Sequence, residues 1–313
     1  MSGETVRAGG PGHGVVGDTR AEWEIREHDL GGTLESGQAF GWQAVEGGWE
    51  GVVAGRWVKL AQEGNRIRAQ TAVPMQDWSW IRDYLALDED LEAIVATFPR
   101  DEPLMKAVGE CRGLRLLRQD PWECLASFIC SSTKQIVQIR EMVRLLRTRY
   151  GTLVKVPTGT DPWHAFPRAE QLAGLEERAL RECKLGFRAP YLLKTAREVT
   201  EGRLDLDAIR RMDLGGARAR LMELPGVGRK VADCALLFGF GFREAFPVDV
   251  WVRVALKRLY FPRARRLTAR RLEQFSATHF GPYSGYAQQY LFHYVRTRLG
   301  RSWARGGGMA NGE

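Results

Sequence analysis

The chain has 313 residues, enough for about two domains of ordinary size. Hydrophobic residues make up 44% and charged residues 27%, a globular balance that excludes wholesale disorder and a fibrous repeat. No apolar run is long enough to cross a bilayer and residues 1–20 lack a signal-peptide core, so we expect an intracellular protein without a membrane partner. The 46 basic against 38 acidic residues give a net charge of +8, which favours a polyanionic partner such as nucleic acid.

The cysteines and histidines predict no metal site. The 5 cysteines are scattered, odd in number and never spaced as CxxC, which argues against a disulfide framework and against a zinc ribbon. The C-terminal region also lacks the four-cysteine cluster that an iron–sulfur centre needs. We therefore expect neither a metal nor a cofactor.

The N-terminal part of the chain has β-like patterning. Residues 1–20 and 304–313 are rich in glycine and polar residues, so we expect disordered tails there. Between residues 38 and 72, four short β-like segments are separated by Glu-Gly-Gly, Ala-Gly and Glu-Gly-Asn, which are plausible hairpin turns. We expect a small antiparallel sheet with its tryptophans covering one face.

After Met75 the apolar residues recur at helical spacing through roughly ten segments, many of which end at glycine or before proline. The pattern predicts an α+β chain. A small antiparallel β domain with covering helices, residues 21–112, packs on a mainly helical domain, residues 113–303.

The segment 219–240 holds the most informative motif. A short helix should end at Leu224, the sequence Pro-Gly-Val-Gly turns the chain, and a second helix begins near Arg229. Gly226 and Gly228 would let the backbone approach a ligand closely, and the outward amides of the new helix suit an anion such as a DNA phosphate. The alternative is a tight helix–helix turn without a ligand.

This hairpin resembles the helix-hairpin-helix of the HhH-GPD superfamily of DNA glycosylases. Downstream, AFPVDVWVRVAL resembles the second half of that signature, with Asp249 lying 19 positions after Lys230, the spacing of the superfamily. The resemblance implies that neutral Lys230 attacks C1′ of a deoxyribose to form a Schiff base and that Asp249 stabilises the charge developing there. On the residues alone, Lys230 could be a phosphate-binding surface lysine and Asp249 the N-cap of a helix starting at Val250.

Within the superfamily, the chain looks like the eukaryotic-type 8-oxoguanine DNA glycosylase/lyases. Endonuclease III-like and adenine glycosylases usually carry an iron–sulfur cluster, and alkylation-repair members generally lack the lysine. The resemblance runs from about residue 22 to 300 in six ordered blocks: 36–42, 117–132, 185–191, 224–234, 247–250 and 285–292.

The resemblance also implies a pocket for an extruded base. Cys234 follows Lys230 by four residues and Phe292 follows Gln288 by four, so each pair shares one helix face. In the family, the Cys and Phe equivalents sandwich the base and the Gln equivalent reads its Watson–Crick edge. The carbonyl of Gly37 would accept the hydrogen that 8-oxoguanine, unlike guanine, carries on N7. Otherwise Cys234 and Phe292 could be core residues and Gly37 a strand-entry glycine.

The resemblance implies DNA contacts at Thr133, Gln138, Phe187, Arg188, Gly226, Gly228 and Trp251. Phe187 stands where an aromatic wedge is expected, and Arg188 retains one of two cytosine-reading arginines. Thr133 stands in place of an asparagine, Gln138 in place of the other arginine, and Trp251 in place of a phosphate-contacting histidine. These losses predict a weaker preference for cytosine opposite the lesion.

Residues 253–272 contain eight basic side chains and no acidic one, so they form either a DNA-facing flank or a solvated helical face. Taken with these patterns, the resemblance implies a monomeric base-excision repair glycosylase with AP lyase activity, acting on 8-oxoguanine in duplex DNA. It would act in the cytoplasm or nucleoid of a bacterium or in the nucleus of a eukaryote. The carbonyls from Pro225 to Gly228 are candidate ligands for a structural monovalent cation. The alternatives are a glycosylase for an alkylated or formamidopyrimidine base and a non-catalytic damaged-DNA-binding protein.

Overall fold

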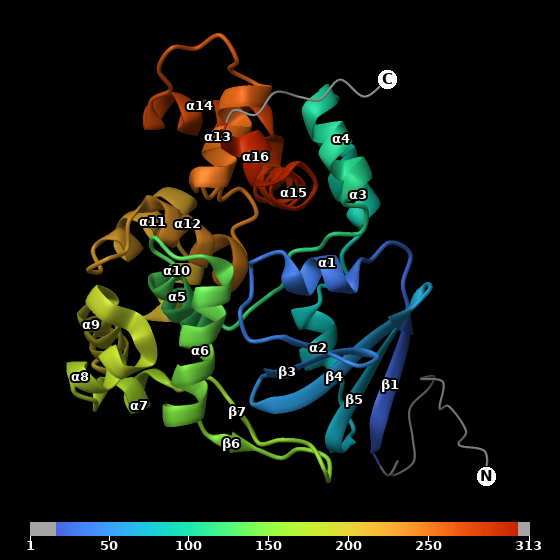
Figure 1. The fold of residues 1–313 in the computed structure, drawn as a ribbon, viewed down its shortest axis with the longest axis vertical. Helices are drawn as coiled ribbons and strands as arrows, with labels where there is room; N and C mark the ends of the chain where they lie inside the picture. The colour runs from blue at the N-terminus through green and yellow to red at the C-terminus, as the bar shows by residue number, and fades with distance from the viewer. Residues whose placement is uncertain (1–16, 306–313) are drawn as a thin grey trace.

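The computed structural model describes residues 17–305, and its ribbon shows a sheet on one side of a larger helical region (Figure 1). Most of the two expected tails, residues 1–16 and 306–313, lies outside the described residues. Residues 18–20 were wrongly assigned to the N-terminal tail, because they begin strand β1 and pair with strand β5. Residues 304–305 likewise close the last helix, α16 (Gly300–Arg305).

The N-terminal sheet has five antiparallel strands in the order β1-β5-β4-β3-β2. Their bounds are β1 Asp18–Glu24, β2 Gln43–Val45, β3 Gly48–Val53, β4 Arg56–Glu63 and β5 Arg66–Met75. The expected hairpins are present, and Val53 pairs with Arg56 across the two-residue turn Ala54-Gly55. Both turn residues have positive φ, 48° and 71°, as a type I′ turn requires.

Both faces of the sheet are covered. Helices α1 (Leu30–Glu35) and α2 (Ser79–Tyr84) contribute Leu30, Leu34 and Ile81 to a cluster with the sheet residues Val58, Leu60 and Ile67. Trp42 and Trp49 belong to this side, whereas Trp57 packs in a separate cluster with Val52 and Val154. The expectation that the tryptophans cover one face was therefore wrong, since adjacent residues of a strand point to opposite faces. Val154 belongs to a short hairpin of β6 (Leu153–Val154) and β7 (Trp163–His164).

The rest of the described chain is mainly helical. The α-helices are α3 Leu91–Ala96, α4 Glu102–Glu110, α5 Pro121–Cys130, α6 Ile136–Tyr150, α7 Ala169–Ala173, α8 Glu177–Leu180, α9 Ala189–Thr200, α10 Leu206–Arg210, α11 Leu214–Met222, α12 Arg229–Ala235, α13 Val250–Leu259, α14 Ala269–His279 and α15 Ser284–Tyr294, followed by α16. Wider π-helical turns extend α12 and α15 over Leu236–Phe240 and Val295–Leu299, whereas α8 is followed by a kinked turn, Arg181–Leu185, in which Lys184 has a positive φ. Within residues 17–305, no helix has the length and apolar character to cross a membrane.

The helical core reaches back across the expected domain boundary. Leu91 and Ile94 of α3 and Leu104 and Ala107 of α4 are buried in the same cluster as α5, α12 and α15. These helices therefore pack with the helical domain, although they lie within the stretch that the sequence assigned to the N-terminal domain. In Figure 1 both stand beside α15. The chain thus enters the helical domain before residue 113, and the α+β class is confirmed.

Candidate active site

The predicted helix-hairpin-helix is present between α11 and α12. Gly226 has a φ of +77°, and a Cβ there would overlap the Tyr191 ring, so this position requires glycine. Gly228 is the N-cap of α12 and is extended, with φ −82° and ψ 175°. A Cβ at Gly228 would meet no described atom within 4 Å. Because packing does not demand glycine there, the open space beside Gly228 is available to a ligand.

Lys230 lies in the first turn of α12 with its amine over the end of α5. Its Nζ donates to Ser131 Oγ at 2.9 Å and lies 5.1 Å from the centroid of the Phe128 ring. The Ser131 hydroxyl donates its own hydrogen to the Phe128 carbonyl at 2.6 Å, which leaves an oxygen lone pair for the lysine. Among the described residues, no carboxylate oxygen forms an ion pair with Lys230 within 4 Å. Ser131, inside a block already singled out in the sequence, is thus a neighbour that the sequence analysis did not assign.

Asp249 is the N-cap of α13, and its Oδ1 accepts a hydrogen bond from the Val252 amide at 2.8 Å. The capping interpretation is therefore correct. Burial raises the pKa of Asp249, while the Val252 and Trp251 amides and the charge of Lys230 act in the opposite direction. The carboxyl is thus held in a low-dielectric position where it senses the charge of Lys230. This arrangement suits a group that stabilises a cation formed beside the amine.

The base-pocket candidates come from both domains. Cys234 is buried on α12, and burial raises the pKa of its thiol to about 12, so it presents a neutral sulfur. Gln288 on α15 is 4% exposed, and its Oε1 has no hydrogen-bond partner among the described residues. Gly37 has a φ of +83°, and a Cβ there would lie 2.7 Å from Ile136 Cδ1 and 3.6 Å from Phe292 Cε1. A buried, unpaired amide oxygen is the kind of group that a ligand satisfies.

Arg296, which the sequence analysis did not single out, interacts with the end of α1, with Phe292 and with Asp249. Its guanidinium lies 5.5 Å from the Phe292 ring centroid, and its Nη2 donates to the Glu35 carbonyl at 2.9 Å. Its charge also acts on Asp249. Phe292 and Arg296 are four residues apart, the only sequence signal for this link. Arg296 thus brings the C-terminal end of α1, the Phe292 ring and Asp249 into one region.

Phe187 and Arg188 are adjacent in the chain but differ in their exposure to solvent. Phe187 is 52% exposed, as expected of a wedge, and the centroid of its ring lies 4.1 Å from the Arg188 guanidinium carbon. Arg188 itself is only 2% exposed. It donates to the Leu185 carbonyl at 3.2 Å, to Thr133 Oγ1 at 2.8 Å and to the Ser132 carbonyl. In this conformation Arg188 is bound to protein oxygens, which a contact to an opposite base would have to replace.

The remaining predicted DNA contacts have structural neighbours of their own. Gln138 is exposed at the start of α6, and its Oε1 accepts the backbone amide of Gln135 at 3.1 Å in a capping box. Thr133 is exposed, with a φ of +56°, on the turn before α6. Trp251 is half-buried against the helical core.

The basic run 253–272 is divided into two sets. Lys257 donates to backbone carbonyls, and Arg258 and Arg271 lie against the rings of Trp303 and Phe261. The remaining arginines are exposed and, within the described part of the chain, have no ion-pair partner: Arg253, Arg263, Arg265, Arg266 and Arg270. They carry the uncompensated charge of this face.

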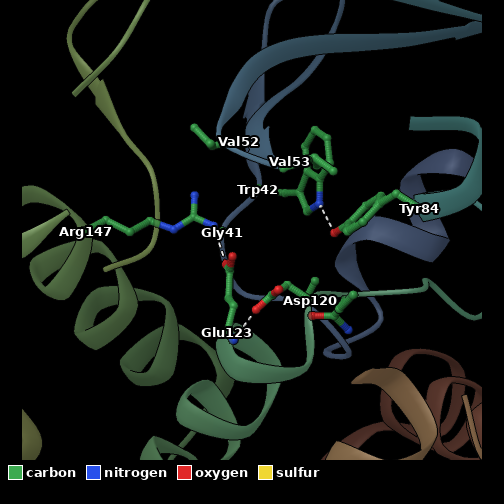
Figure 2. Close-up of a pocket in the computed structure, with 11 residues that line it drawn as sticks. Gly41, Trp42, Val52, Val53, Tyr84, Asp120, Glu123 and Arg147 are labelled. Atoms are coloured by element: carbon green, nitrogen blue, oxygen red, sulfur yellow. Dashed lines mark hydrogen bonds and ion pairs between the residues drawn. The ribbon is translucent and has the colours of Figure 1, made fainter. Parts of the chain in front are cut away.

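A small cavity of about 40 Å³ lies between the sheet and the N-terminal end of α5 (Figure 2). Arg147 and Glu123 form an ion pair beside Gly41, and Trp42 Nε1 donates to the Tyr84 hydroxyl at 2.8 Å. The volume suits two or three waters rather than a base. None of the predicted site residues lines it. Across residues 17–305, no group of three or more His, Cys, Asp or Glu side chains could hold a metal ion.

Comparison with known proteins identifies the class. Residues 22–125 match the N-terminal domain of 8-oxoguanine DNA glycosylase, and residues 126–277 match the HhH-GPD superfamily of base excision DNA repair proteins. The chain belongs to this superfamily, and the matched range 126–277 includes the hairpin, Lys230 and Asp249.

Individual relatives narrow the family. The chain is 33% identical to a probable N-glycosylase/DNA lyase of Methanothermobacter thermautotrophicus, covering 87% of this chain and 95% of that protein. It is 30% identical to an N-glycosylase/DNA lyase of Arabidopsis thaliana, covering 83% and 75%. The Clostridium acetobutylicum 8-oxoguanine glycosylase/lyase, solved with double-stranded DNA containing cytosine opposite 8-oxoguanine, superimposes with a TM-score of 0.82 at 30% identity, over 90% and 99% of the two chains. The protein is a member of the N-glycosylase/DNA lyase family, a bifunctional DNA glycosylase and AP lyase of base excision repair.

Proposed function

We propose that this enzyme excises 8-oxoguanine from duplex DNA and then cleaves the strand at the abasic site, with Lys230 as the nucleophile. The observation that carries the proposal is the position of the Lys230 amine, which donates to Ser131 Oγ and whose charge acts on buried Asp249 at the start of α13. A surface lysine that only binds phosphate would need neither neighbour. A non-catalytic damage-binding protein would gain only the α13 cap from Asp249, which an uncharged Asn or Ser provides as well.

The chemistry follows from these groups. Lys230 Nζ, as the neutral amine, forms a bond to C1′ as the bond from C1′ to the base nitrogen breaks. The base leaves with the electron pair and takes up the proton that the amine nitrogen gives up. The Asp249 carboxylate stabilises the positive charge at C1′ during this step. The adduct opens to a Schiff base by breaking the C1′–O4′ bond. Loss of a C2′ proton then expels the 3′ phosphate, and water releases the lysine.

The base would bind between Cys234 and Phe292. A neutral sulfur and an aromatic ring suit the two faces of a flipped purine. Gln288 Oε1, buried without a partner among the described residues, would accept from the base edge. The Gly37 carbonyl would accept the N7 hydrogen of 8-oxoguanine and face a lone pair in guanine, a mismatch of about 1–3 kcal/mol, or roughly 10–100-fold. The Gly37 carbonyl thus favours 8-oxoguanine over an alkylated purine that has no hydrogen on N7. A guanine-derived formamidopyrimidine keeps that N–H, so excision assays are needed to separate these two lesions.

We expect the enzyme to discriminate only weakly among the bases opposite the lesion. Gln138 cannot reproduce a two-nitrogen arginine contact, and its amide oxygen already accepts a backbone hydrogen bond. Arg188 would have to leave three protein oxygens to reach a base. We expect a weak preference for cytosine opposite the lesion, and a hundredfold preference for cytosine in a four-duplex assay would contradict this. Phe187, Thr133 and the hairpin amides at Gly226 and Gly228 would hold the duplex, with Trp251 packed beside them.

The proposal extends to the enzyme's setting. The proposed site draws all its residues from one chain, which supports action as a monomer. Genomic DNA as the substrate implies an intracellular protein, in the nucleoid of a bacterium or the nucleus of a eukaryote. The hairpin carbonyls from Pro225 to Gly228 are candidate ligands for a structural monovalent cation, because the turn at Gly226 would let them converge.

Borohydride trapping tests the central step. A duplex with one 8-oxoguanine opposite cytosine should give a covalent complex with the wild type and none with Lys230→Gln. Trapping only on an abasic-site duplex would retain Lys230 as the nucleophile and assign the glycosylase to another lesion, which alkylated and formamidopyrimidine duplexes would then identify. A lack of trapping on both duplexes would overturn the lyase mechanism.

A further inference from the structure

Gln38 follows Gly37 directly and is fully buried. Its Oε1 accepts the Leu117 amide at 2.7 Å. Its Nε2 lies within donating distance of three oxygens: the Thr33 carbonyl at 3.1 Å, Ser36 Oγ at 2.9 Å and the Arg115 carbonyl at 2.8 Å. A buried amide stabilises a fold only when its groups are paired in this way. The segment that carries Gly37 is therefore fixed at its very next residue.

A second set of hydrogen bonds leads from Gln38 to the catalytic helix. The Gln38 carbonyl accepts from Gln119 Nε2 at 2.7 Å. The Gln119 backbone amide donates to the Phe238 carbonyl at 2.9 Å. Phe238 lies in the π-helical turn Leu236–Phe240, which continues α12 beyond Lys230. The peptide after Gly37 is thus joined through one side chain, Gln119, to the helix that carries the nucleophile.

Gly37 has no side chain with which to fix its own carbonyl, and its φ of +83° lies where other residues are strained. Its position must come from its neighbours. The carbonyl and the Lys230 amine have to reach N7 and C1′ of one nucleotide at the same time, and a misplacement of about 1 Å can reduce a rate roughly a hundredfold.

We propose that Gln38 and Gln119 are positioning residues that hold the Gly37 carbonyl in register with Lys230, so that lesion recognition and attack occur on the same nucleotide. The inference rests on the proposed function, because it assumes that Gly37 reads the base. It assigns no contact with DNA to either glutamine. Their effect should appear in base excision and not in cleavage of a preformed abasic site, where no base is read.

The test compares three variants of the full chain. Gln119→Leu removes one side-chain link and keeps the backbone bond to Phe238, so it should fold. Gln38→Met removes the whole cluster and serves as the severe case. Tyr84→Phe is the matched control. It deletes the 2.8 Å hydrogen bond that anchors Trp42, a few residues after Gln38, and leaves the hydrogen bonds of both glutamines intact. Single-turnover excision of 8-oxoguanine and lyase cleavage of an abasic-site duplex are measured for each.

Gln119→Leu should slow excision tenfold or more and change abasic-site cleavage less than twofold, whereas Tyr84→Phe should leave both within twofold of wild type. Unchanged excision in Gln119→Leu would overturn the proposal, as would an equal fall in both activities, which would indicate general damage. If Gln38→Met remains folded, it should be slower still in excision alone. If borohydride traps the wild-type enzyme on abasic DNA but the enzyme does not excise 8-oxoguanine, the proposed substrate is refuted, and this inference with it.

Discussion

Asp249 has two interactions that substitution can separate. Its Oδ1 caps α13 through the Val252 amide, and its charge lies in a buried position near Lys230. Asp249→Asn retains an oxygen that can accept the amide hydrogen and removes the charge. Asp249→Ala removes both. The pair of variants therefore measures the cap and the charge independently.

The expected stabilities follow from the geometry. Loss of an N-cap costs about 1 kcal/mol, which corresponds to roughly 2–4 °C in Tm for a domain of this size. Burial raises the pKa of Asp249, so at neutral pH the ionised carboxylate is less favourable in the folded chain than in water. Asp249→Asn should thus be at least as stable as the wild type, and Asp249→Ala about 1 kcal/mol less stable than Asp249→Asn. Both should lose about 100–1,000-fold in the rate of base excision, the usual effect of deleting a preorganised electrostatic group.

Thermal and urea unfolding at pH 7, with single-turnover excision of 8-oxoguanine, provide the two measurements. Equal stability of Asp249→Asn and Asp249→Ala would show that the cap contributes nothing. An Asp249→Asn enzyme within tenfold of the wild-type rate would refute the electrostatic role.

Three further predictions concern titration and the pocket. Because the pKa of Asp249 is raised and its ionised form is the active one, the single-turnover rate should fall as pH decreases through a value above about 4, and a limb at or below 4 would contradict this. Burial lowers the pKa of His28 to about 3, so as the pH falls from 7 to 5 the unfolded chain takes up a proton on His28 and the folded chain does not. The free energy of unfolding should therefore be about 2 kcal/mol lower at pH 5 than at pH 7. His28→Phe should flatten this pH dependence in urea titrations. Gly37→Ala should reduce excision at least tenfold, since a methyl group would clash with Ile136 at 2.7 Å and strain φ, whereas abasic-site cleavage should persist; equal losses in both assays would indicate misfolding.

The hairpins of the sheet could be predicted because their turns are short and rich in glycine. Strand β1 could not, because its sequence Asp-Thr-Arg-Ala-Glu-Trp-Glu is charged and lacks a clear apolar alternation. Its residues make sense only beside β5, where Glu22 forms ion pairs with Arg66 at 3.0 Å and Arg68 at 2.7 Å. Charges on such an edge strand also discourage further pairing. A local sequence pattern does not show which distant strand a segment will pair with.

A similar limit explains the domain boundary. Apolar spacing indicates that α3 and α4 each bury one face, but it does not say against what. The helical core supplies the partner through α15, nearly two hundred residues downstream in the chain.

The candidate site also contains residues that the sequence could predict and residues that it could not. Lys230 and Cys234 share one helix, so spacing alone places them together. Ser131 and Arg296 contact this region from other elements, and only the fold brings them there. Arg188 shows the converse. The motif identifies the residue, but its burial against protein oxygens depends on the turn before α6.

The division of the pocket between two domains has a consequence for specificity. The Lys230 amine and Asp249 belong to the helical domain, whereas the carbonyl that would distinguish 8-oxoguanine from guanine belongs to the loop after α1. On the proposed mechanism, we expect chemistry at C1′ to proceed without that loop and selection of the base to require it. A change at the domain interface should first lower discrimination between bases and only later the lyase rate. The fully paired amide of Gln38 beside Gly37 is what such an arrangement requires, because the recognising group must be as rigid as the nucleophile it directs.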